Sequence, residues 1–565
     1  MGFSITETLS KGRNVVPMEK RNKTLAYSLV LIATCLDNLN VAGTMTSVFS
    51  VAERFDASTT TVSWVFSSYA LTLGAFIIIA GKLADVWGPH NVFLVGLFFT
   101  SLFALISAVI VDQIIVLIVF RALQGVFAAS LIPSAFSLTG NYFKGDALLK
   151  ALAWFIMSLT VVFGIGVILG GAFSVSSVGY KGLYYFTFAV GMACFIALYF
   201  IIIPIEKTEG HQNLKIENLD YGGSAFLVIG LLLINLGLTE GGESWHKASS
   251  YVPLVVGVLV FFGVVIFEMW YIQGFKDKVN SQINNIEGNT THFGNEQIKE
   301  NQDDVCNGSI KSTSEFSGTN DWRYKIELLF PREVIKIPNF FQYLFATFLF
   351  YINYIAVMST VVQYSQYIEL DSPIMAALKV LPLALGVTFA AVTYRQNLAQ
   401  RVGTKFIICC TPILVLTMSV WISRLDFRVK NSYWKYECIG QFIFGFGTNI
   451  YFQVYWSDII TGTPLHLQGV VSGILQTAGQ IGLCFGNTII AALAGELKYT
   501  RDYDTRVELH HKFKKNFYLA YAGSAALFFV LLTVKGKKSV AAKDDVENQP
   551  KNQDLETNQD TSNAN

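Results

Sequence analysis

Asp37 is the residue of this sequence best placed to do chemistry, because it is an ionisable group inside a long apolar run. The run begins near residue 25, so Asp37 lies about 18 Å along a helix that rises about 1.5 Å per residue. That depth is close to the middle of a ~30 Å hydrocarbon core, where burial disfavours an ion and so favours the protonated carboxyl. The position suits proton binding and release. The alternative is a structural hydrogen-bonding group paired with Asn38, Asn40 or a neighbouring helix.

Two basic residues also lie within apolar runs. Arg121 is too deep for a surface charge, so its guanidinium needs hydrogen-bond acceptors within the protein. It could stabilise the Asp37 carboxylate until a proton or a substrate displaces the pair. Alternatively, it could form permanent hydrogen bonds to backbone carbonyls. Lys379 has a long stem that can reach outward, and we expect it to be structural. Glu268 and Asp458 lie near the ends of runs, where a solvated or capping role is expected, and the histidines all fall in loops or at run ends. Asp37, with Arg121 beside it, is therefore the predicted proton-coupling group.

Uncharged polar residues within apolar runs are candidates to line a cavity for a small molecule. Most lie in the second half of the chain. The candidates are Gln124, Asn353, Tyr354, Asn449, Gln453, Gln476 and Gln480.

The composition excludes an ordinary water-soluble protein. Of 565 residues, 52% are hydrophobic and only 14% are charged, and the mean hydropathy is +0.46, whereas soluble domains carry about 25% charged residues. A net charge of +1, from 41 Lys+Arg and 40 Asp+Glu, provides no positive field for nucleic acid. We therefore expect an integral membrane protein that binds the lipid bilayer and no nucleic acid.

Motifs of enzymes and cofactor sites are missing from the sequence. It has no P-loop, no His-Glu-x-x-His helix and no Gly-x-Ser-x-Gly elbow. The seven cysteines, six of them in or beside apolar runs, show no spacing typical of a zinc site. We expect no enzymatic activity, no cofactor and no metal.

Apolar runs of spanning length predict fourteen transmembrane helices and no strands. The predicted fold is two six-helix bundles with two extra helices between them. The runs lie near 25–48, 63–82, 91–110, 114–137, 151–173, 182–203, 221–239, 251–272, 339–363, 373–395, 404–423, 437–460, 468–494 and 516–535.

The domain boundaries follow from these runs and from composition. We predict an N-terminal tail (1–24), an N-terminal bundle (25–205), two extra helices (219–272), a polar central loop (273–330), a C-terminal bundle (339–535) and a C-terminal tail (536–565). The central loop and the last tail are rich in Asn, Gln and charged residues, so we expect them to be disordered. Lys and Arg outside the runs divide 26 to 13 between the two faces, which places both termini in the cytoplasm.

Two short loops show an internal duplication. Leu83-Ala84-Asp85 followed by Gly88 matches Leu398-Ala399-Gln400 followed by Gly403 at the same spacing. Two related halves are typical of transporters that work by alternating access.

The motifs resemble those of the major facilitator superfamily, and more narrowly of its fourteen-span drug:proton antiporter branch. Gly81-x-Leu83-Ala84-Asp85-x-x-Gly88 is similar to the family's signature loop, and Arg121-x-x-Gln124-Gly125 to its second motif. The run Gly166 to Gly171 is similar to the antiporter motif but lacks its proline. The Trp456-Ser457-Asp458 sequence most resembles fungal aminotriazole and boron resistance transporters.

The resemblance implies a role for the signature loop. Gly81, Asp85 and Gly88 would form a latch that holds one conformation across the two halves, whereas from sequence alone Asp85 could be only a helix-terminus charge. Gly166, Gly170 and Gly171 let neighbouring helices approach closely in either interpretation.

The leading hypothesis is a proton-coupled secondary transporter that exports a small toxic solute or drug. The alternatives are an importer or facilitator of a small nitrogen compound or amino acid, motivated by the missing proline, and a transporter-like nutrient sensor that signals through 274–325 or the tail. We expect a monomer whose partners are a small-molecule substrate and protons. The resemblance favours the plasma membrane over the vacuolar membrane.

Overall fold

The structure is a computed structural model that describes residues 17–57, 59–109, 112–205, 220–241, 246–294, 321–326, 328–394, 402–464, 467–494 and 500–535. These residues form helices and connections, with no strand among them. Thirteen helical stretches in the described chain are long and apolar enough to cross a membrane, and the helix Cys438–Thr461 adds a further long, more polar one. The prediction of an all-helical membrane protein is therefore confirmed.

The N-terminal bundle consists of α2 (Lys23–Phe55), α3 (Thr59–Trp87), α4 (Pro89–Val109), α5 (Ile114–Ala128), α6 (Leu131–Tyr142), α7 (Asp146–Val175) and α8 (Lys181–Ile201). The fourth predicted run is split into α5 and α6. Pro133 has no N–H to donate to the carbonyl of Ala129, so the helical hydrogen-bond ladder breaks there. The Ser130 hydroxyl instead donates to the Phe127 carbonyl at 2.8 Å.

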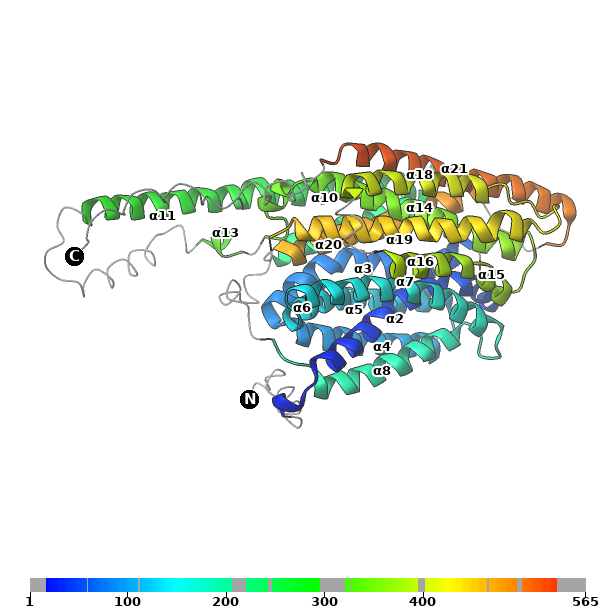
Figure 1. The fold of residues 1–565 in the computed structure, drawn as a ribbon, viewed down its shortest axis with the longest axis horizontal. Helices are drawn as coiled ribbons and strands as arrows, with labels where there is room; N and C mark the ends of the chain where they lie inside the picture. The colour runs from blue at the N-terminus through cyan, green and yellow to red at the C-terminus, as the bar shows by residue number, and fades with distance from the viewer. Residues whose placement is uncertain are drawn as a thin grey trace, which may run out of the picture.

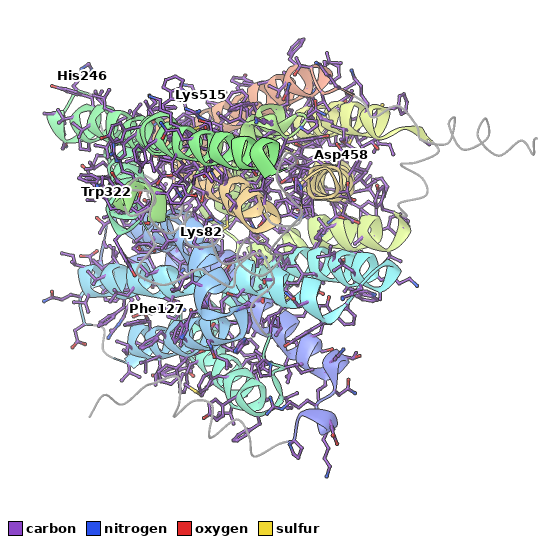
Figure 2. The ribbon with its side chains drawn as sticks, turned by 90° about the vertical axis from the view of Figure 1, so that its left-hand side faces the viewer. Lys82, Phe127, His246, Trp322, Asp458 and Lys515 are labelled. Atoms are coloured by element: carbon purple, nitrogen blue, oxygen red, sulfur yellow. The ribbon has the colours of Figure 1, made fainter. Side chains whose placement is uncertain are left out.

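The C-terminal bundle consists of α14 (Phe340–Tyr367), α15 (Pro373–Lys379), α16 (Leu381–Thr393), α18 (Thr404–Ile422), α19 (Cys438–Thr461), α20 (Gln468–Ala494) and α21 (Tyr503–Leu532). A π-helical turn, η6 (Tyr433–Glu437), leads into α19. Pro382 separates α15 from α16 for the same reason that Pro133 separates α5 from α6. Viewed along the helices, the N-terminal bundle fills the lower half of the molecule and the C-terminal bundle the upper half (Figure 2).

The two extra helices are α9 (Tyr221–Gly241) and α10 (Ala248–Ile266), and they pack closely because glycines line their contact. A Cβ on Gly237 would lie 2.5 Å from the backbone nitrogen of Leu254, and one on Gly257 would lie 2.6 Å from that of Ile234. The pair packs through α9 against α3 and α20. The extra helices therefore flank a place where the two bundles meet.

A long helix continues from α10 into the segment for which composition predicts disorder. The π-helical turn η4 (Phe267–Ile272) joins α10 to α11 (Gln273–Gly294), which projects well beyond the bundles (Figure 1). The short helix α13 (Trp322–Lys325) contacts its first turns, where the Arg323 guanidinium lies 3.9 Å from the Phe275 ring centroid and the Tyr324 hydroxyl donates to Asn280 Oδ1 at 2.9 Å. Continuation of a membrane helix and this packing explain the difference. Residues 295–320 and the tail 536–565 lie outside the described part of the chain.

The remaining short elements are η1 (Met18–Lys20) and η5 (Arg332–Lys336). η1 precedes α2 and η5 precedes α14. Each therefore lies at the entrance to one of the two bundles.

Small residues set the closest helix contacts. Within the N-terminal bundle, Gly166 and Gly170 of α7 face α2, where an added Cβ would lie 2.7 Å from the Leu39 carbonyl oxygen and 2.2 Å from the Gly43 carbonyl oxygen respectively. Between the bundles, a Cβ on Gly171 would lie 2.6 Å from the Cβ of Ala377 in α15. These glycines hold α7 against both its own bundle and the other one.

We predict that Gly170→Ala destabilises the protein. The new Cβ meets a backbone oxygen and the Thr46 hydroxyl at 2.4 Å rather than the end of a flexible side chain, so α2 and α7 must separate, at a cost of about 1–3 kcal/mol. Thermal unfolding of the detergent-solubilised chain measures the effect. Gly140→Ala is the matched control, since nothing lies within 4 Å of its Cβ position. Equal unfolding temperatures for the two variants would contradict the packing described here.

Candidate functional site

A buried cluster of Asp37, Tyr69 and Arg121 lies inside the N-terminal bundle. The Asp37 side chain, on α2, is 2% exposed and accepts a hydrogen bond from the Tyr69 hydroxyl of α3. The Tyr69 ring in turn lies 4.2 Å from the Arg121 guanidinium carbon of α5, a favourable cation–π distance. Tyr69 therefore connects the acidic and the basic group, which are also close enough to interact electrostatically.

Arg121 is completely buried and held from three directions. Its Nε donates to the Val65 carbonyl at 3.2 Å, and its two terminal nitrogens donate to Gln124 Oε1 at 2.8 Å and to Thr44 Oγ1 at 3.3 Å. Both contacts considered from sequence are thus present: a bond to a backbone carbonyl and proximity to the Asp37 carboxyl. The fixed guanidinium supplies positive charge beside a carboxyl that has no access to water.

The side-chain amide of Gln124 has hydrogen-bond partners, whereas that of Asn40 has none in the described part of the chain. Gln124 is fully buried, and its Nε2 donates to the Thr100 carbonyl at 3.3 Å while its Oε1 accepts from Arg121. Its amide therefore supports the cluster from within the bundle. Asn40, one turn from Asp37, is also fully buried, but neither polar atom of its side chain has a partner in the described part of the chain.

The C-terminal bundle presents polar groups to this cluster. Tyr351 of α14 interacts electrostatically with Asp37, and its hydroxyl donates to Gln476 Oε1 of α20 at 3.3 Å. Gln480, one turn further along α20, packs against Gly74 of α3, where an added Cβ would lie 2.7 Å from the Gln480 Cβ. Gln476 and Gln480 therefore lie where the two bundles meet, beside the Asp37 cluster.

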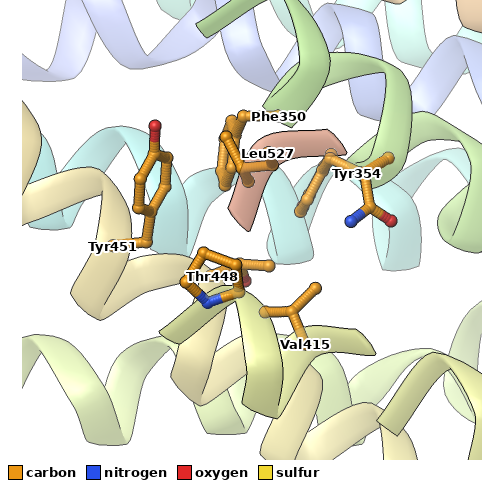
Figure 3. Close-up of a pocket in the computed structure, with 8 residues that line it drawn as sticks. Phe350, Tyr354, Val415, Thr448, Tyr451 and Leu527 are labelled. Carbon is orange, nitrogen blue, oxygen red and sulfur yellow. The ribbon is translucent and has the colours of Figure 1, made fainter. Parts of the chain in front are cut away.

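The other predicted cavity residues lie deeper in the C-terminal bundle. Gln453 donates to Asn449 Oδ1 within α19, and Asn353 donates to Ser524 of α21. Asn353 and Tyr354 line a small pocket with Phe350, Pro412, Val415, Thr448, Tyr451 and Leu527 (Figure 3). Helices α14, α18, α19 and α21 form its walls, and a space of about the size of one water molecule is too small for a substrate in this conformation.

The predicted latch is described only in part. Gly88 ends α3 with φ +91°, a conformation that favours glycine, and Gly81 faces Pro133 of α6. Asp85 lies in the last turn of α3. The Asp85 side chain and the matching residues Leu398 to Gln400 lie outside the described part of the structure, so the latch stays a prediction.

The competing acidic groups have structural partners. Glu268 Oε2 accepts from the backbone nitrogens of Leu329 and Phe330 at 3.0 Å each, which ties the end of α10 to the segment before α14. Asp458 Oδ2 accepts from the Tyr343 hydroxyl at 2.6 Å. Both groups therefore act at helix ends, away from the Asp37 cluster.

Sequence reasoning missed Tyr69, which makes the only hydrogen bond to the Asp37 carboxyl among the described residues. A tyrosine in an apolar run is a weak signal, since most buried tyrosines simply pack there. Only the register of α2 and α3 brings the Tyr69 hydroxyl to the carboxyl.

Comparison with known proteins gives one family. The sequence profile of the Major Facilitator Superfamily matches residues 30–487. Among the relatives, Multidrug resistance protein 3 of Bacillus subtilis is 28% identical over 252 residues, covering 44% of this chain and 46% of that protein. The low affinity ammonium transporter of Saccharomyces cerevisiae is 32% identical over 214 residues (36% and 40%), and the aminotriazole resistance protein of the same yeast is 28% identical over 251 residues (42% and 46%). The chain thus matches less than half the length of each of these relatives.

Solved structures share the fold. The human organic anion transporter MFSD10 aligns with a TM-score of 0.55 at 11% identity, covering 91% of this chain and 100% of that one. At this identity the likeness concerns the fold alone. The family profile, however, covers most of the chain, and the relatives include multidrug transporters and an aminotriazole resistance protein, consistent with a drug-efflux branch. This chain therefore belongs to the Major Facilitator Superfamily and is an integral membrane protein.

Proposed function

We propose that the chain is a proton-coupled secondary active transporter that exports small toxic solutes or drugs by alternating access. The observation that carries the proposal is the buried Asp37 carboxyl, bonded to Tyr69, whose ring lies against the Arg121 guanidinium. The names of the multidrug and aminotriazole resistance relatives support export. The plasma membrane, cytoplasmic termini and a monomeric state are part of the same proposal.

The cluster can couple a proton to a conformational change through charge. With Asp37 ionised, the Tyr69 hydroxyl and the Arg121 charge stabilise the anion, and the three helices α2, α3 and α5 are held together. A proton on Asp37 neutralises the carboxylate, which weakens its attraction to the Tyr69 hydroxyl and the Arg121 charge. The protonated and ionised forms therefore favour different packings of the helices that meet the C-terminal bundle.

The contacts between the bundles suit a rocking motion. The Thr477 hydroxyl of α20 donates to the Gly74 carbonyl of α3 at 3.0 Å, and a Cβ on Gly164 of α7 would lie 2.3 Å from the Ala384 Cβ of α16. Both contacts involve small residues, so the surfaces are smooth enough to slide. Gln476, Gln480 and Tyr351 lie beside them and are the proposed substrate contacts, and Gly81, Asp85 and Gly88 are the proposed latch.

A second candidate function is import or facilitated uptake of a small nitrogen compound. Two observations favour it: the run from Gly166 to Gly171 lacks the proline of the antiporter motif, and one relative is a low affinity ammonium transporter. The direction of solute movement separates the two functions.

Replacing Asp37 by Asn should abolish proton-coupled transport and leave the protein folded, because Asn keeps the size of the side chain but cannot exchange a proton. Intracellular accumulation of borate, triazoles, basic amino acids, ammonium and cationic dyes is measured in cells lacking or expressing the chain. Export predicts that accumulation of one solute class falls with expression and recovers in Asp37→Asn.

The matched control is Asp56→Asn, an exposed aspartate that ends α2 with φ 47°, a conformation that Asn adopts readily. It should transport like the wild type. Accumulation that rises with expression would favour the importer, and full pH-driven transport by Asp37→Asn would contradict the role given to this carboxyl.

Removing the Tyr69 hydroxyl in Tyr69→Phe should shift the pH dependence of transport toward higher pH. The ring remains to hold Arg121, but the ionised carboxylate loses its donor, and a hydrogen bond to a charged group contributes about 1.5–3 kcal/mol. Since 1.36 kcal/mol corresponds to about one pH unit, we expect a shift of about one to two units in the pH profile of transport by proteoliposomes.

Tyr27→Phe serves as the control for this shift. Tyr27 also lies on α2 and loses a buried hydrogen bond, to the Ala151 carbonyl at 2.7 Å. The pH midpoint of this variant should stay at the wild-type value. An unshifted midpoint in Tyr69→Phe would show that the Tyr69 hydroxyl does not set the proton affinity of the site.

A further inference from the structure

A second buried charged cluster lies in the C-terminal bundle, where α14 connects to α15 and where α19 begins. The Lys379 ammonium of α15 contacts both Glu369 Oε2 and Asp371 Oδ2 of the connection. The side chains of these three residues are 14% to 21% exposed. One ammonium thus pairs with two partly buried carboxylates, and the three groups together keep one negative charge.

A third carboxyl, Glu437, is fully buried and lies on the same π-helical turn as Tyr433, whose ring centroid is 5.8 Å from Lys379 Nζ. It ends the π-helical turn η6, and its Oε1 accepts from Gln441 Nε2 at 2.8 Å. Its Oε2 has no hydrogen-bond partner in the described chain, and neither has Gln441 Oε1 on the next turn, although Gln441 is 1% exposed. Glu437 interacts electrostatically with Glu369, Asp371 and Lys379.

Other titratable groups add no positive charge that contacts Glu437. Tyr364 of α14 interacts with Glu369 and Glu437, and its hydroxyl is bonded to His510 Nδ1 of α21 at 2.9 Å. Tyr433 and Cys438 lie on the same helix as Glu437, and the Tyr433 ring is 5.8 Å from Lys379 Nζ. Within the described chain, no group of three or more His, Cys, Asp and Glu residues could hold a metal ion.

Ionisation of all three carboxyls would leave this cluster with two more negative charges than positive ones. Three ionised carboxylates would face one ammonium, and a buried ion without full pairing costs several kcal/mol. Glu369 and Asp371 already pair with Lys379, whereas Glu437 has an oxygen with no partner. A proton on Glu437 halves this excess negative charge and turns Oε2 into a donor, for which Gln441 Oε1 on the next turn is an acceptor without a partner.

We propose that Glu437 is the proton-binding group of a second site, with Lys379 as its exchangeable counter-ion. With Glu437 protonated, Lys379 pairs with Glu369 and Asp371, as in this structure. When Glu437 releases its proton, its carboxylate competes for the Lys379 ammonium. The inference goes beyond the proposed function, since it holds whether or not Asp37 carries the transported proton.

The site is connected to the contact between the bundles through α15. Ala377, two residues before Lys379, packs against Gly171 of α7, and the Pro373 carbonyl oxygen would lie 2.8 Å from a Cβ on Gly171. A change in the partner of Lys379 therefore acts on a helix of seven residues that touches the N-terminal bundle. Proton release at Glu437 is thus positioned to loosen this contact.

Infrared difference spectroscopy of the full chain in lipid nanodiscs tests the proposal. Raising the pH should remove a carboxylic acid C=O band in the wild type, and Glu437→Gln, which resembles the protonated acid, should lack that change. Asp37→Asn should keep it, which separates this site from the proposed transport site. A Glu437→Gln spectrum identical to that of the wild type would overturn the proposal.

Thermal unfolding against pH provides a second, independent readout. Unfolded Glu releases its proton near about pH 4.3, so a native state that keeps the proton binds more protons than the unfolded chain, and stability falls as pH rises. The unfolding temperature of Glu437→Gln should therefore exceed that of the wild type increasingly above about pH 5. Glu508→Gln, an exposed glutamate of α21 paired with Lys512, is the control and should follow the wild type.

Lys379→Gln keeps the proposal testable if Glu437→Gln does not fold. Without the ammonium, the ionised form of Glu437 loses its counter-ion, so the carboxylic acid band should persist to higher pH than in the wild type. Loss of the band at the wild-type pH in Lys379→Gln would exclude Lys379 as the counter-ion and overturn the proposal.

Discussion

A carboxyl group buried at the middle of a membrane protein must find every partner within the protein, and the N-terminal bundle is arranged around this requirement. Asp37 has Tyr69 as its donor, and Tyr69 in turn lies against Arg121. Arg121 needs acceptors of its own, which Val65, Thr44 and Gln124 supply. One ionisable residue on α2 therefore determines polar residues on α3 and α5, because an unpaired charge in a low dielectric is too costly to keep.

Close approach of helices is the second condition for such a cluster. The partners of Asp37 come from α3 and α5, and on another side of α2 Gly166 and Gly170 allow α2 and α7 to touch backbone to backbone. The contacts between the two bundles use small residues in the same way, at Gly74, Gly164 and Gly171. Surfaces without protruding side chains can both pack and slide. The same small residues therefore allow close packing and the motion that transport requires.

The two bundles differ in how their charged side chains are paired inside the protein. In the N-terminal bundle, acid and base are joined through an aromatic ring and fixed backbone acceptors, so the arginine is immobile. In the C-terminal bundle, the Lys379 ammonium sits among three carboxyls on a flexible stem beside a short helix. A fixed counter-ion stabilises one state of its carboxyl, whereas a mobile one can change partners, which is why the second cluster is the more suitable place for an exchange of ion pairs.

Much of this architecture is determined by the sequence alone. Each apolar run corresponds to one membrane-spanning stretch of the described chain, two of them broken by proline, since the hydrophobic length of a span is a local property. The depth of Asp37 and Arg121 follows from counting along those runs. The breaks at Pro133 and Pro382 are equally local, although a count of apolar residues passes over them. The helical continuation into α11 was not predictable from composition, because its first turns are held by contacts with Arg323 and Tyr324 from beyond a gap in the described chain.

The partners of the charges were decided only by tertiary structure: Tyr69, Tyr351 and Glu437 reach their charged neighbours through the rotation and register of packed helices. Neither quantity is encoded in the hydrophobicity of any one segment, since helices that are apolar on all sides carry no signal of which face meets which neighbour.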